Sequence, residues 1–474
     1  MTTPTLTVGR VSPQGVTRQD AGAEAAADVG LREANPTYGV GKKVTLESIC
    51  SLIADCPHST PFWTASGYLV IRNQNIKNGQ LDLSEKSYTD HKHYLIRIRR
   101  ARPQYGDLIF TREAPMGEVC MVPEDLECCV GQRQVLLRPD PEKVHPRYLL
   151  YAIQSPEVQH EISWSEGTGS TVSNVRIPVL KSLKIPVRSI TEQVQAASLL
   201  GALDDRIALL HETNATLESI AQALFKSWFV DFDPVRARQQ GLAPEGMDEA
   251  TAALFPDGFE ESELGLVPSG WDISPVYSLA EYVNGAAYKA FQPNNDGRGL
   301  PIIKIAELKS GVTTQTAFSD AAMPEKYRIK TRDILFSWSG NPDTSIDTFV
   351  WPHDEAWLNQ HIFRVLPASV AERSFVLQTL RYLKPVFAEL ARNKQTTGLG
   401  HVTVSDLKQL RVVKPPMQLL RRWSEVIDPL LDQAFVVQRQ AQTLATLRDT
   451  LLPRLISGQL RLPGHAPDEF EVIA

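Results

Sequence analysis

The sequence predicts an α/β fold of the α+β type, with two mixed domains in tandem, two long antiparallel helices that separate them as a coiled coil, and an internal pseudo-two-fold repeat. Three observations predict this architecture. Short motifs recur along the 474 residues at a nearly constant offset. Each of the two blocks that contain these motifs is followed by a long helical pattern. In the first helical pattern, apolar residues keep the alternating three-four spacing of a coiled coil for about four heptads.

The repeat is visible in three pairs of segments. They are residues 67–79 (Gly-Tyr-Leu-Val-Ile-Arg to Asn-Gly) with 299–311 (Gly-Leu-Pro-Ile-Ile-Lys to Ser-Gly), Gly169 with Gly400 in two glycine-rich loops, and Leu217 with Leu444, at offsets of 232, 231 and 227 residues. The first pair predicts a strand followed by a turn in both copies. Chance similarity of short strands is the alternative. A constant offset implies two copies of one unit, in which a mixed block of about 120 to 150 residues precedes a helix.

The long helices are predicted from their apolar seams. The seam consists of Leu200, Leu203, Ile207, Leu210, Asn214, Leu217 and Leu224 in the first helix and of Leu430, Val437, Leu444 and Leu451 in the second. Asn214 is the one polar member, and a buried amide at such a position fixes the register of a coiled coil. We expect the two helices to pack together. The alternative is that each helix packs only on its own block.

The predicted boundaries follow from these patterns. They are 1–40, a disordered N-terminal extension; 41–190, the first domain; 191–235, the first helix; 236–266, an exposed acidic linker; 267–415, the second domain; 416–464, the second helix; and 465–474, a tail. Asp233-Pro234 is expected to end the first helix, because a residue before proline avoids the helical region. Pro453 with Ser457-Gly458 is expected to end the second helix, and Pro429 to lie in its first turn.

The composition is that of an ordinary globular protein, with 42% hydrophobic and 22% charged residues. No run approaches the roughly 18 apolar residues of a membrane-spanning helix, and the N-terminus lacks the order of a secretory signal. We therefore expect a cytoplasmic protein without a membrane partner. The five cysteines are odd in number and never spaced C-x-x-C, which disfavours a disulfide framework or a four-thiolate zinc site.

The net charge of −6 is unevenly distributed. Residues 61–190 and 271–420 each contain 17 Lys and Arg against 14 Asp and Glu, whereas residues 191–270 contain 4 against 14. Two mildly basic blocks could contact a polyanion while an acidic connector faces away from it. A random fluctuation of charge is the alternative.

Motifs for catalysis, cofactors or metals are weak. The Gly41-Lys42 pair lacks the glycine of a phosphate-binding loop, and residues 35–38 (Asn-Pro-Thr-Tyr) only approach a methyltransferase motif. Residues 140–143 (Asp-Pro-Glu-Lys) favour a turn over half of a nuclease site. His91 and His93 would share one side of a strand, but no third ligand is suggested. No catalytic, cofactor-binding or metal-binding residue is predicted.

A binding signal is stronger. The densest basic cluster interleaves Lys and Arg with Tyr94 and two histidines over residues 91–102, and two glycine-rich loops at 167–173 and 398–403 bring small polar groups. Such residues suit phosphate contacts and readout of guanine. The candidate DNA-binding residues are Arg72, Lys92, Arg97, Arg99, Arg100, Arg102, Thr168, Ser170, Thr171, Lys304, His401 and Thr403. A solvated surface strand and two plain turns are the alternatives.

Four phrases carry a family resemblance. They are 200–207 (Leu-Gly-Ala-Leu-Asp-Asp-Arg-Ile), 223–236 (Ala-Leu-Phe-Lys-Ser-Trp-Phe-Val-Asp-Phe-Asp-Pro-Val-Arg), 267–271 (Val-Pro-Ser-Gly-Trp) and 451–460 (Leu-Leu-Pro-Arg-Leu-Ile-Ser-Gly-Gln-Leu). From residue 41 onward the chain resembles the specificity (S) subunits of type I restriction–modification systems. The phrases match the central region of that family, the opening of its second target-recognition domain and its closing region. Residues 1–40 have no counterpart there, and the second helix lacks the Trp-Phe-Val-Asp-Phe-Asp-Pro phrase.

The resemblance implies a sequence-specific, non-catalytic subunit that binds double-stranded DNA. Each target-recognition domain would read one half of a bipartite asymmetric site, and the helices would set the spacer. The helices would also dock two methyltransferase (M) subunits for adenine N6 methylation, and restriction (R) subunits would add ATP-dependent cleavage. S-adenosylmethionine, ATP and Mg would bind to the partners and not to this chain. The alternative is a DNA-binding scaffold subunit of another phage-defence assembly; a self-contained methyltransferase or nuclease is disfavoured by the missing motifs.

Overall fold

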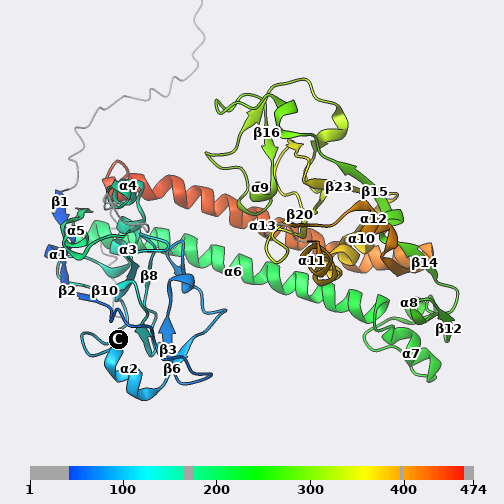
Figure 1. The fold of residues 1–474 in the computed structure, drawn as a ribbon, viewed down its shortest axis with the longest axis horizontal. Coiled ribbons are helices and arrows are strands. Elements are labelled where there is room, and N and C mark those ends of the chain that lie inside the picture. The colour runs from blue at the N-terminus through cyan, green and yellow to red at the C-terminus, as the bar shows by residue number, and fades with distance from the viewer. Residues whose placement is uncertain (1–41, 165–173, 395–398, 464–474) are drawn as a thin grey trace, which may run out of the picture. The chain divides into compact units, whose positions relative to one another are not determined.

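The computed structural model describes residues 42–164, 174–394 and 399–463 (Figure 1). The predictions for residues 1–40 and 465–474 lie outside the described residues, as do those for Thr168, Ser170 and Thr171. Among the described residues, no helix is both long enough and apolar enough to cross a membrane.

The first domain is built around a four-stranded antiparallel sheet in the order β2-β10-β7-β8. Its elements are β1 (Lys42–Thr45), α1 (Leu46–Ile49), β2 (Cys50–Asp55), β3 (Tyr68–Ile71), η1 (Asn73–Asn75), β4 (Ile76–Lys77), β5 (Gln80–Leu81), β6 (Tyr88–Thr89), α2 (His91–Arg97), β7 (Leu108–Thr111), β8 (Val119–Met121), β9 (Cys128–Val130), β10 (Gln134–Pro139), α3 (Pro146–Gln154), α4 (Pro156–Trp164), α5 (Ile177–Ser182) and β11 (Lys184–Val187). Strand β3 lies between β6 and β9 in a smaller sheet and runs parallel to β9. The central strand β7, Leu-Ile-Phe-Thr, is buried along its whole length, as expected of a short apolar run.

The second domain repeats this plan with the sheet β15-β23-β19-β21. Its elements are β14 (Asp272–Pro275), η2 (Val276–Leu279), β15 (Ala280–Asn284), η3 (Tyr288–Phe291), β16 (Leu300–Ile303), α9 (Ile305–Ser310), β17 (Phe318–Ser319), η4 (Glu325–Tyr327), β18 (Arg328–Ile329), β19 (Ile334–Ser337), β20 (Ser339–Gly340), β21 (Asp347–Val350), β22 (Ala356–Leu358), β23 (Ile362–Pro367), α10 (Val370–Tyr382), α11 (Lys384–Asn393), β24 (Gly400–His401), α12 (Val404–Gln409) and β25 (Arg411–Lys414). Strand β16 runs parallel to β22, as β3 does to β9.

The two domains are therefore copies of one unit, as the sequence predicts. The strands of the first domain, from β1 and β2 through β3 and β7 to β11, recur in the second domain after an offset of 226 to 232 residues. The long helices α6 (Ile190–Phe229) and α13 (Met417–Ser457) follow the two domains at an offset of 227 residues. The strand expected after Gly67 is β3, and the strand expected after Gly299 is β16.

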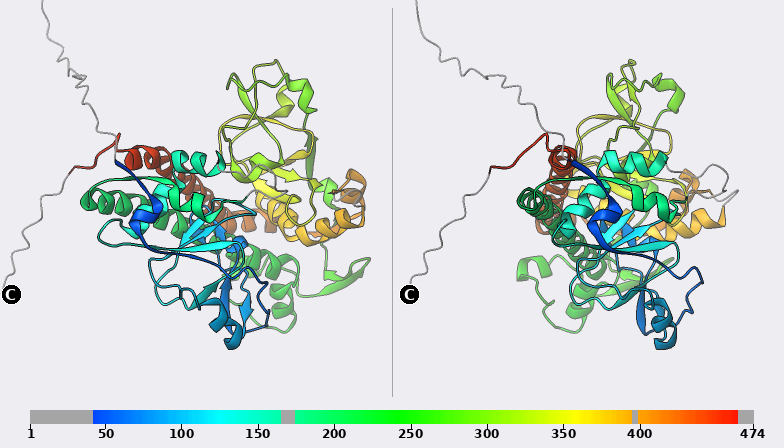
Figure 2. Two further views of the ribbon diagram at one scale, coloured as in Figure 1. Left: turned by 60° about the vertical axis from the view of Figure 1, so that its left-hand side comes forward. Right: turned by 90° about the vertical axis from the view of Figure 1, so that its left-hand side faces the viewer.

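Helices α6 and α13 lie side by side and run in opposite directions (Figures 1 and 2). Leu200 near the start of α6 packs in one cluster with Leu455 near the end of α13, whereas Trp228 near the end of α6 contacts Trp423 near the start of α13 at 5.3 Å between rings. At mid-length, buried Leu210 packs with residues on α13. The helix pair therefore carries the first domain at one end and the second domain at the other, through the two cores that these residues join.

The helix ends follow standard capping chemistry, although two predicted boundaries are wrong. At the start of α6, the Ser189 side chain accepts a bond from the Glu192 N–H, and Glu192 accepts one in return. Helix α6 ends at Phe229, four residues before Asp233, because the backbone leaves the helical region at Val230 (φ −123°). Phe232 is left-handed (φ 56°), and Asp233-Pro234 begins the next helix, α7, instead of ending α6. Helix α13 begins at Met417, so Pro429 lies inside it and not in its first turn, which is the second wrong boundary. The helix also continues through Pro453 and ends at Ser457, as predicted, before Gly458, whose φ of 80° suits a helix C-terminus.

The predicted exposed linker at 236–266 is a folded segment. It contains the end of α7 (Asp233–Gln239), α8 (Glu249–Ala252) and a hairpin of β12 (Phe259–Ser262) and β13 (Gly265–Pro268). Phe255 is buried against Trp228 at 5.3 Å between rings, and Arg422 of α13 donates to Thr251 at 2.6 Å. The segment is acidic, but Phe255 and the partly buried Met247, Leu254 and Phe259 pack against the core of the second domain and attach the segment to it.

Candidate nucleic-acid interface

Polar residues follow the parallel strand pair of each domain. Because β3 and β9 are parallel, they end at the same edge of their sheet, and this edge brings Arg72 next to the turn that contains Gln132. In the second domain, β16 and β22 likewise bring Lys304 near Gln360. Each domain thus gathers a cation and an amide from two separate parts of the sequence. We call these the first and the second strand-end sites.

The first strand-end site is a cleft of about 500 Å³. Its lining includes Trp63, Arg72, Asn73, Gln74, Gln132 and Arg133. The Arg72 guanidinium lies over the Trp63 ring, 5.2 Å from its centroid, and Arg72 Nη1 lies 3.4 Å from the Ser87 hydroxyl. The Arg72 backbone N–H donates to the buried Asn75 side chain at 2.9 Å, and this bond fixes the main chain from which the Arg72 side chain extends.

The second strand-end site has the same arrangement with different side chains. The Lys304 ammonium lies 5.5 Å from the centroid of the Tyr288 ring and 3.7 Å from Glu307. The Lys304 backbone N–H donates to Glu307 at 3.0 Å, which is the equivalent of the Arg72–Asn75 bond. Gln360 accepts a bond from the Tyr288 backbone N–H at 3.0 Å. One geometry therefore presents arginine with tryptophan in one domain and lysine with tyrosine in the other.

The basic cluster at 91–102 begins with a helix, not a strand. Asp90 caps α2 by accepting a bond from the His93 N–H at 2.8 Å. Arg97 on the inner face of α2 is 4% exposed and donates to the carbonyls of Val130, Ser59 and Pro57. Burial lowers the pKa of Arg97 from its ordinary value. Its N–H groups hold the protein together, so Arg97 is not placed to contact DNA.

The remaining candidates differ in how far they are free to bind DNA. Arg100 donates to the Asp55 carbonyl at 3.0 Å, and Arg102 pairs with Glu127 at 2.8 Å. Lys92 and Arg99 are exposed, and neither has an ion pair within the part of the chain that the structure describes. Those two side chains are the most available of the cluster.

In the second glycine-rich loop, His401 and Thr403 are separated in role. His401 is exposed on β24, which pairs with β20. The Thr403 hydroxyl caps α12, accepting from the Asp406 N–H at 3.2 Å and donating to the Asp406 carboxylate at 2.6 Å. Thr403 is therefore used within the fold, and His401 remains open to solvent.

The two histidines of α2 have separate partners. His91 Nδ1 lies 2.9 Å from the Tyr68 hydroxyl, and His93 Nδ1 lies 2.8 Å from Asp90.

The turn predicted at 140–143 is present, with the Lys143 N–H donating to the Asp140 carbonyl at 2.9 Å.

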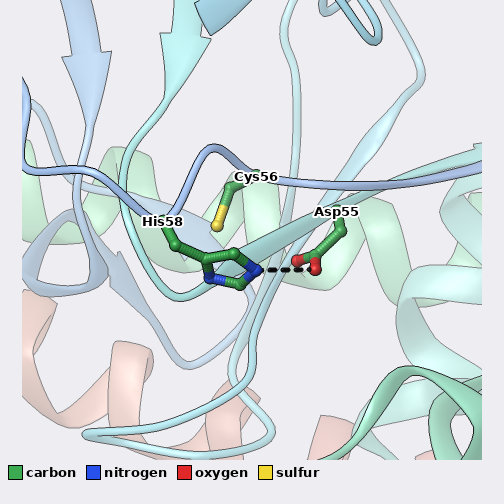
Figure 3. Close-up of side chains that lie close together, drawn as sticks. All are labelled: Asp55, Cys56 and His58. Atoms are coloured by element: carbon green, nitrogen blue, oxygen red, sulfur yellow. Dashed lines mark hydrogen bonds and ion pairs between the residues drawn. The ribbon is translucent and has the colours of Figure 1, made fainter.

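Asp55, Cys56 and His58 form the one group within the described ranges whose spacing suits a metal ion, with ligand atoms within 4.8 Å of one another (Figure 3). The Asp55 carboxylate already accepts from Arg112 at 3.0 Å and lies 3.1 Å from His58 Nε2. Burial raises the pKa of the Cys56 thiol, which favours its neutral form. A guanidinium on the carboxylate and a neutral thiol do not fit a divalent cation, so we interpret the group as a structural link.

Sequence reasoning missed the partners of Arg72 and Lys304. Trp63 and Tyr288 precede these cations by 9 and 16 residues, and Gln132 and Gln360 follow them by 60 and 56. No local spacing connects them: the parallel strand pairing brings Gln132 and Gln360 to the two cations, and the segments before β3 and β16 bring the two aromatic rings. The repeat contained the one usable signal, since it aligns Arg72 with Lys304 at an offset of 232.

Comparison with known proteins identifies the class of this chain. Residues 42–219 and 268–437 match the type I restriction modification DNA specificity domain, and the chain belongs to this family. It is a DNA specificity subunit of a type I restriction–modification system, the non-catalytic component of such complexes.

Individual relatives are distant but extensive. The chain is 24% identical over 361 residues to the type I restriction enzyme MjaIX specificity subunit of Methanocaldococcus jannaschii, covering 75% of this chain and 78% of that protein. It is also 24% identical over 400 residues to the HindI specificity subunit of Haemophilus influenzae, covering 75% and 86%. The crystal structure of the S subunit from M. genitalium shares the fold, with a TM-score of 0.53 at 17% identity over 90% of this chain and 98% of that one.

Proposed function

We propose that each domain reads one half of a bipartite asymmetric DNA site and that α6 and α13 set the spacer between the halves. The observation that supports this proposal is the placement of two copies of one unit at opposite ends of an antiparallel helix pair. Helices of 40 and 41 residues are about 60 Å long. That length exceeds the roughly 34 Å of one turn of DNA, so both domains can contact one face of the duplex.

The same helices would dock two methyltransferase subunits, since the repeat offers two related surfaces to two copies of one partner. Those subunits would bring S-adenosylmethionine and flip an adenine out of each half-site for methylation at N6. Restriction subunits would add ATP- and Mg-dependent cleavage. This chain would supply binding energy and position, and the complex would act on DNA in the cytoplasm.

The distribution of charge supports a DNA-binding role despite the net charge of −6. The blocks 61–190 and 271–420 each carry an excess of three positive charges, and the acidic residues concentrate in 191–270. Phosphate contacts depend on local Lys and Arg and not on net charge. Lys92 and Arg99 on the first domain are exposed and unpaired within the described residues, as phosphate contacts require.

The test is single-molecule sequencing of adenine methylation in cells that express this chain with or without a methyltransferase gene of the same system. We expect a split motif that appears only when both genes are present. Methylation from this chain alone would contradict the non-catalytic assignment. A complex that forms but yields no motif would contradict the recognition role and favour a scaffold function.

The spacer role has a separate test. Insertion of four residues between Asn214 and Leu217, with a matched insertion between Ala441 and Leu444, would lengthen the helix pair by about 6 Å. We expect a longer spacer and unchanged half-sites in the methylation motif, because neither domain is altered. A motif with the original spacer would contradict the role of the helices as a ruler.

A further inference from the structure

We propose that Arg72 reads a guanine in the half-site of the first domain and that Trp63 holds its guanidinium in place for this contact. The proposal rests on the function proposed above, and it goes further by naming the base and the residue. The strand-end site of the second domain would read its half-site with a different side chain, Lys304.

Arg72 combines a fixed position with free donors. Its backbone N–H is bound by Asn75, and Asn75 in turn donates to the carbonyls of Asp82 and Glu85, each at 2.8 Å. The guanidinium lies over the Trp63 ring, with its carbon 5.2 Å from the ring centroid. No carboxylate pairs with Arg72 in the described part of the chain, whereas Arg112 and Arg138 are each paired with an aspartate. A guanidinium that is held over a ring retains N–H groups at its edge for a ligand.

The surroundings of Arg72 favour a base over a phosphate. Three neutral amides, from Asn73, Gln74 and Gln132, line the same cleft, and their NH2 groups donate within the protein, to the Glu113 carbonyl, Glu85 and Thr60 respectively. A lining of neutral amides suits a base edge better than a phosphate, whose charge it does not neutralise. The planar fork of arginine matches the O6 and N7 acceptors of guanine, which is the commonest specific contact in the major groove. Lys92 on α2 and Arg99 just beyond it are exposed to solvent and are better placed to contact phosphates.

Gly131 allows the turn after β9 to lie close to the end of β3. A Cβ added at Gly131 would lie 2.6 Å from the Ile71 carbonyl oxygen, which already accepts a bond from the Gly131 N–H at 2.8 Å. Only glycine allows the turn after β9 to approach the end of β3 so closely, and this approach places Gln132 in the cleft with Arg72.

The two strand-end sites would therefore read different bases. Lys304 is a single point donor with Glu307 at 3.7 Å, and it lacks the fork that binds two acceptors at once. Gln360 and His361, which lie 3.2 Å apart, stand where the first domain has Gln132 and Arg133. Different donors at equivalent positions predict an asymmetric DNA site.

The experiment uses the assembled methyltransferase complex with wild-type, R72K and R72A subunits. After the wild-type motif is sequenced, binding is measured to duplexes in which each guanine of either half-site is replaced in turn by 7-deazaguanine, which lacks N7. We expect one position, in one half-site only, to weaken wild-type binding about 10-fold or more. R72A should be insensitive at that position, and both variants should methylate sites degenerate there while the other half-site is unchanged.

R236K is the matched control, because the Arg236 guanidinium also lies over an aromatic ring, 5.3 Å from the Phe259 centroid, but on α7, outside the cleft and the two long helices; it should retain the wild-type motif. Subunit assembly and thermal midpoint are compared for all variants, so that loss of folding is separated from loss of specificity. If R72K keeps the wild-type motif and R72A weakens all duplexes equally, Arg72 contacts a phosphate and the proposal is wrong. The proposal is also wrong if one half-site contains no G·C pair and R72A does not change recognition of the other half-site. Absence of any motif with the wild-type complex would instead refute the proposed function.

Discussion

The two recognition domains share one backbone plan but are attached to the helix pair by different chemistry. Aromatic rings dominate the attachment of the second domain: Phe229 lies 5.0 Å from Trp423 and 5.2 Å from Phe375. Aliphatic residues such as Leu200 and Leu455 dominate at the first domain. The four-stranded sheets nevertheless have the same strand order, and the offsets between equivalent strands of the two domains differ by at most six residues. The plan thus depends on the pattern of burial and pairing, which leaves the packing and the strand-end residues free to differ between copies.

The largest expected effect separates the two attachments. Trp423 is fully buried between α6 and the second domain, and Trp423→Ala should lower the free energy of unfolding by about 3–5 kcal/mol through lost burial and a cavity. Hydrogen exchange followed by mass spectrometry should show faster exchange in the second domain, residues 272–414, and little change in the first.

Leu200→Ala is the matched variant at the other end, because Leu200 is also fully buried. It should cost about 2–5 kcal/mol and accelerate exchange in the first domain, residues 42–187. If either variant accelerates exchange equally in both domains, the helix pair and its two domains unfold as one cooperative unit. The two domains would then not be attached independently.

Most of the fold could be predicted because its signals are periodic. The offset of 227 to 232 residues and the three-four spacing of the helices require no knowledge of tertiary contacts. Of the seam residues, Leu200, Ile207, Leu210 and Val437 are buried, and Asn214 is half-buried with its Oδ1 enclosed. The duplication and the antiparallel helices follow from these patterns.

The errors in the fold arise where tertiary context outweighs a local rule. Proline removes one backbone donor from a helix, yet Pro429 is exposed, so water can satisfy the carbonyl left without a partner, and α13 continues. At 91–97, the two histidines obscured a helical signal that was present: Asp90 is a favourable N-cap, and Tyr94 and Arg97 recur on one buried face.

The strand-end sites could be predicted only in part, because tertiary contacts bring some of their residues together. Arg72 and Lys304 were found because they end repeated strands, whereas Trp63 and Gln132 become neighbours of Arg72 only through the fold. The charge of Arg97 predicts a DNA contact, but its burial depends on the position of the Val130 carbonyl, which the sequence does not give. Charge density marks a candidate surface, but it does not say which cations the fold has already used.

A second test concerns two arginines of the same cluster. Arg97→Ala should lower the free energy of unfolding by about 1–3 kcal/mol, because it leaves buried carbonyl groups without donors. Arg99→Ala should leave stability within about 0.5 kcal/mol of wild type and reduce the salt dependence of DNA binding. Urea unfolding and binding titrations at several salt concentrations measure both. An Arg97 variant of full stability, or an unchanged salt slope for the Arg99 variant, would reverse the roles assigned here.

The smallest expected difference lies at one equivalent position in the two domains. The third residue of α3 is Tyr148, whose hydroxyl donates to the Pro186 carbonyl at 3.0 Å. The third residue of α10 is Glu372, which accepts from Lys414 at 2.9 Å and from Ser369 at 2.9 Å. Burial tends to raise the pKa of Glu372, but these two hydrogen bonds outweigh it and hold the pKa below its ordinary value. A neutral pair in one domain thus corresponds to a charged pair in the other.

Acid should therefore weaken the second domain selectively at this position. Because the pKa of Glu372 is lower in the folded state, its contribution is complete above the unfolded value of about 4.3 and is lost as the pH falls through the native pKa. We expect the free energy of unfolding, measured by urea titration, to fall between pH 7 and pH 3 by about 1 kcal/mol more for wild type than for E372Q. Tyr148→Phe removes a neutral hydrogen bond and should lower stability equally at every pH in this range. If E372Q and wild type lose stability in parallel on acidification, the Glu372–Lys414 pair contributes nothing that depends on charge.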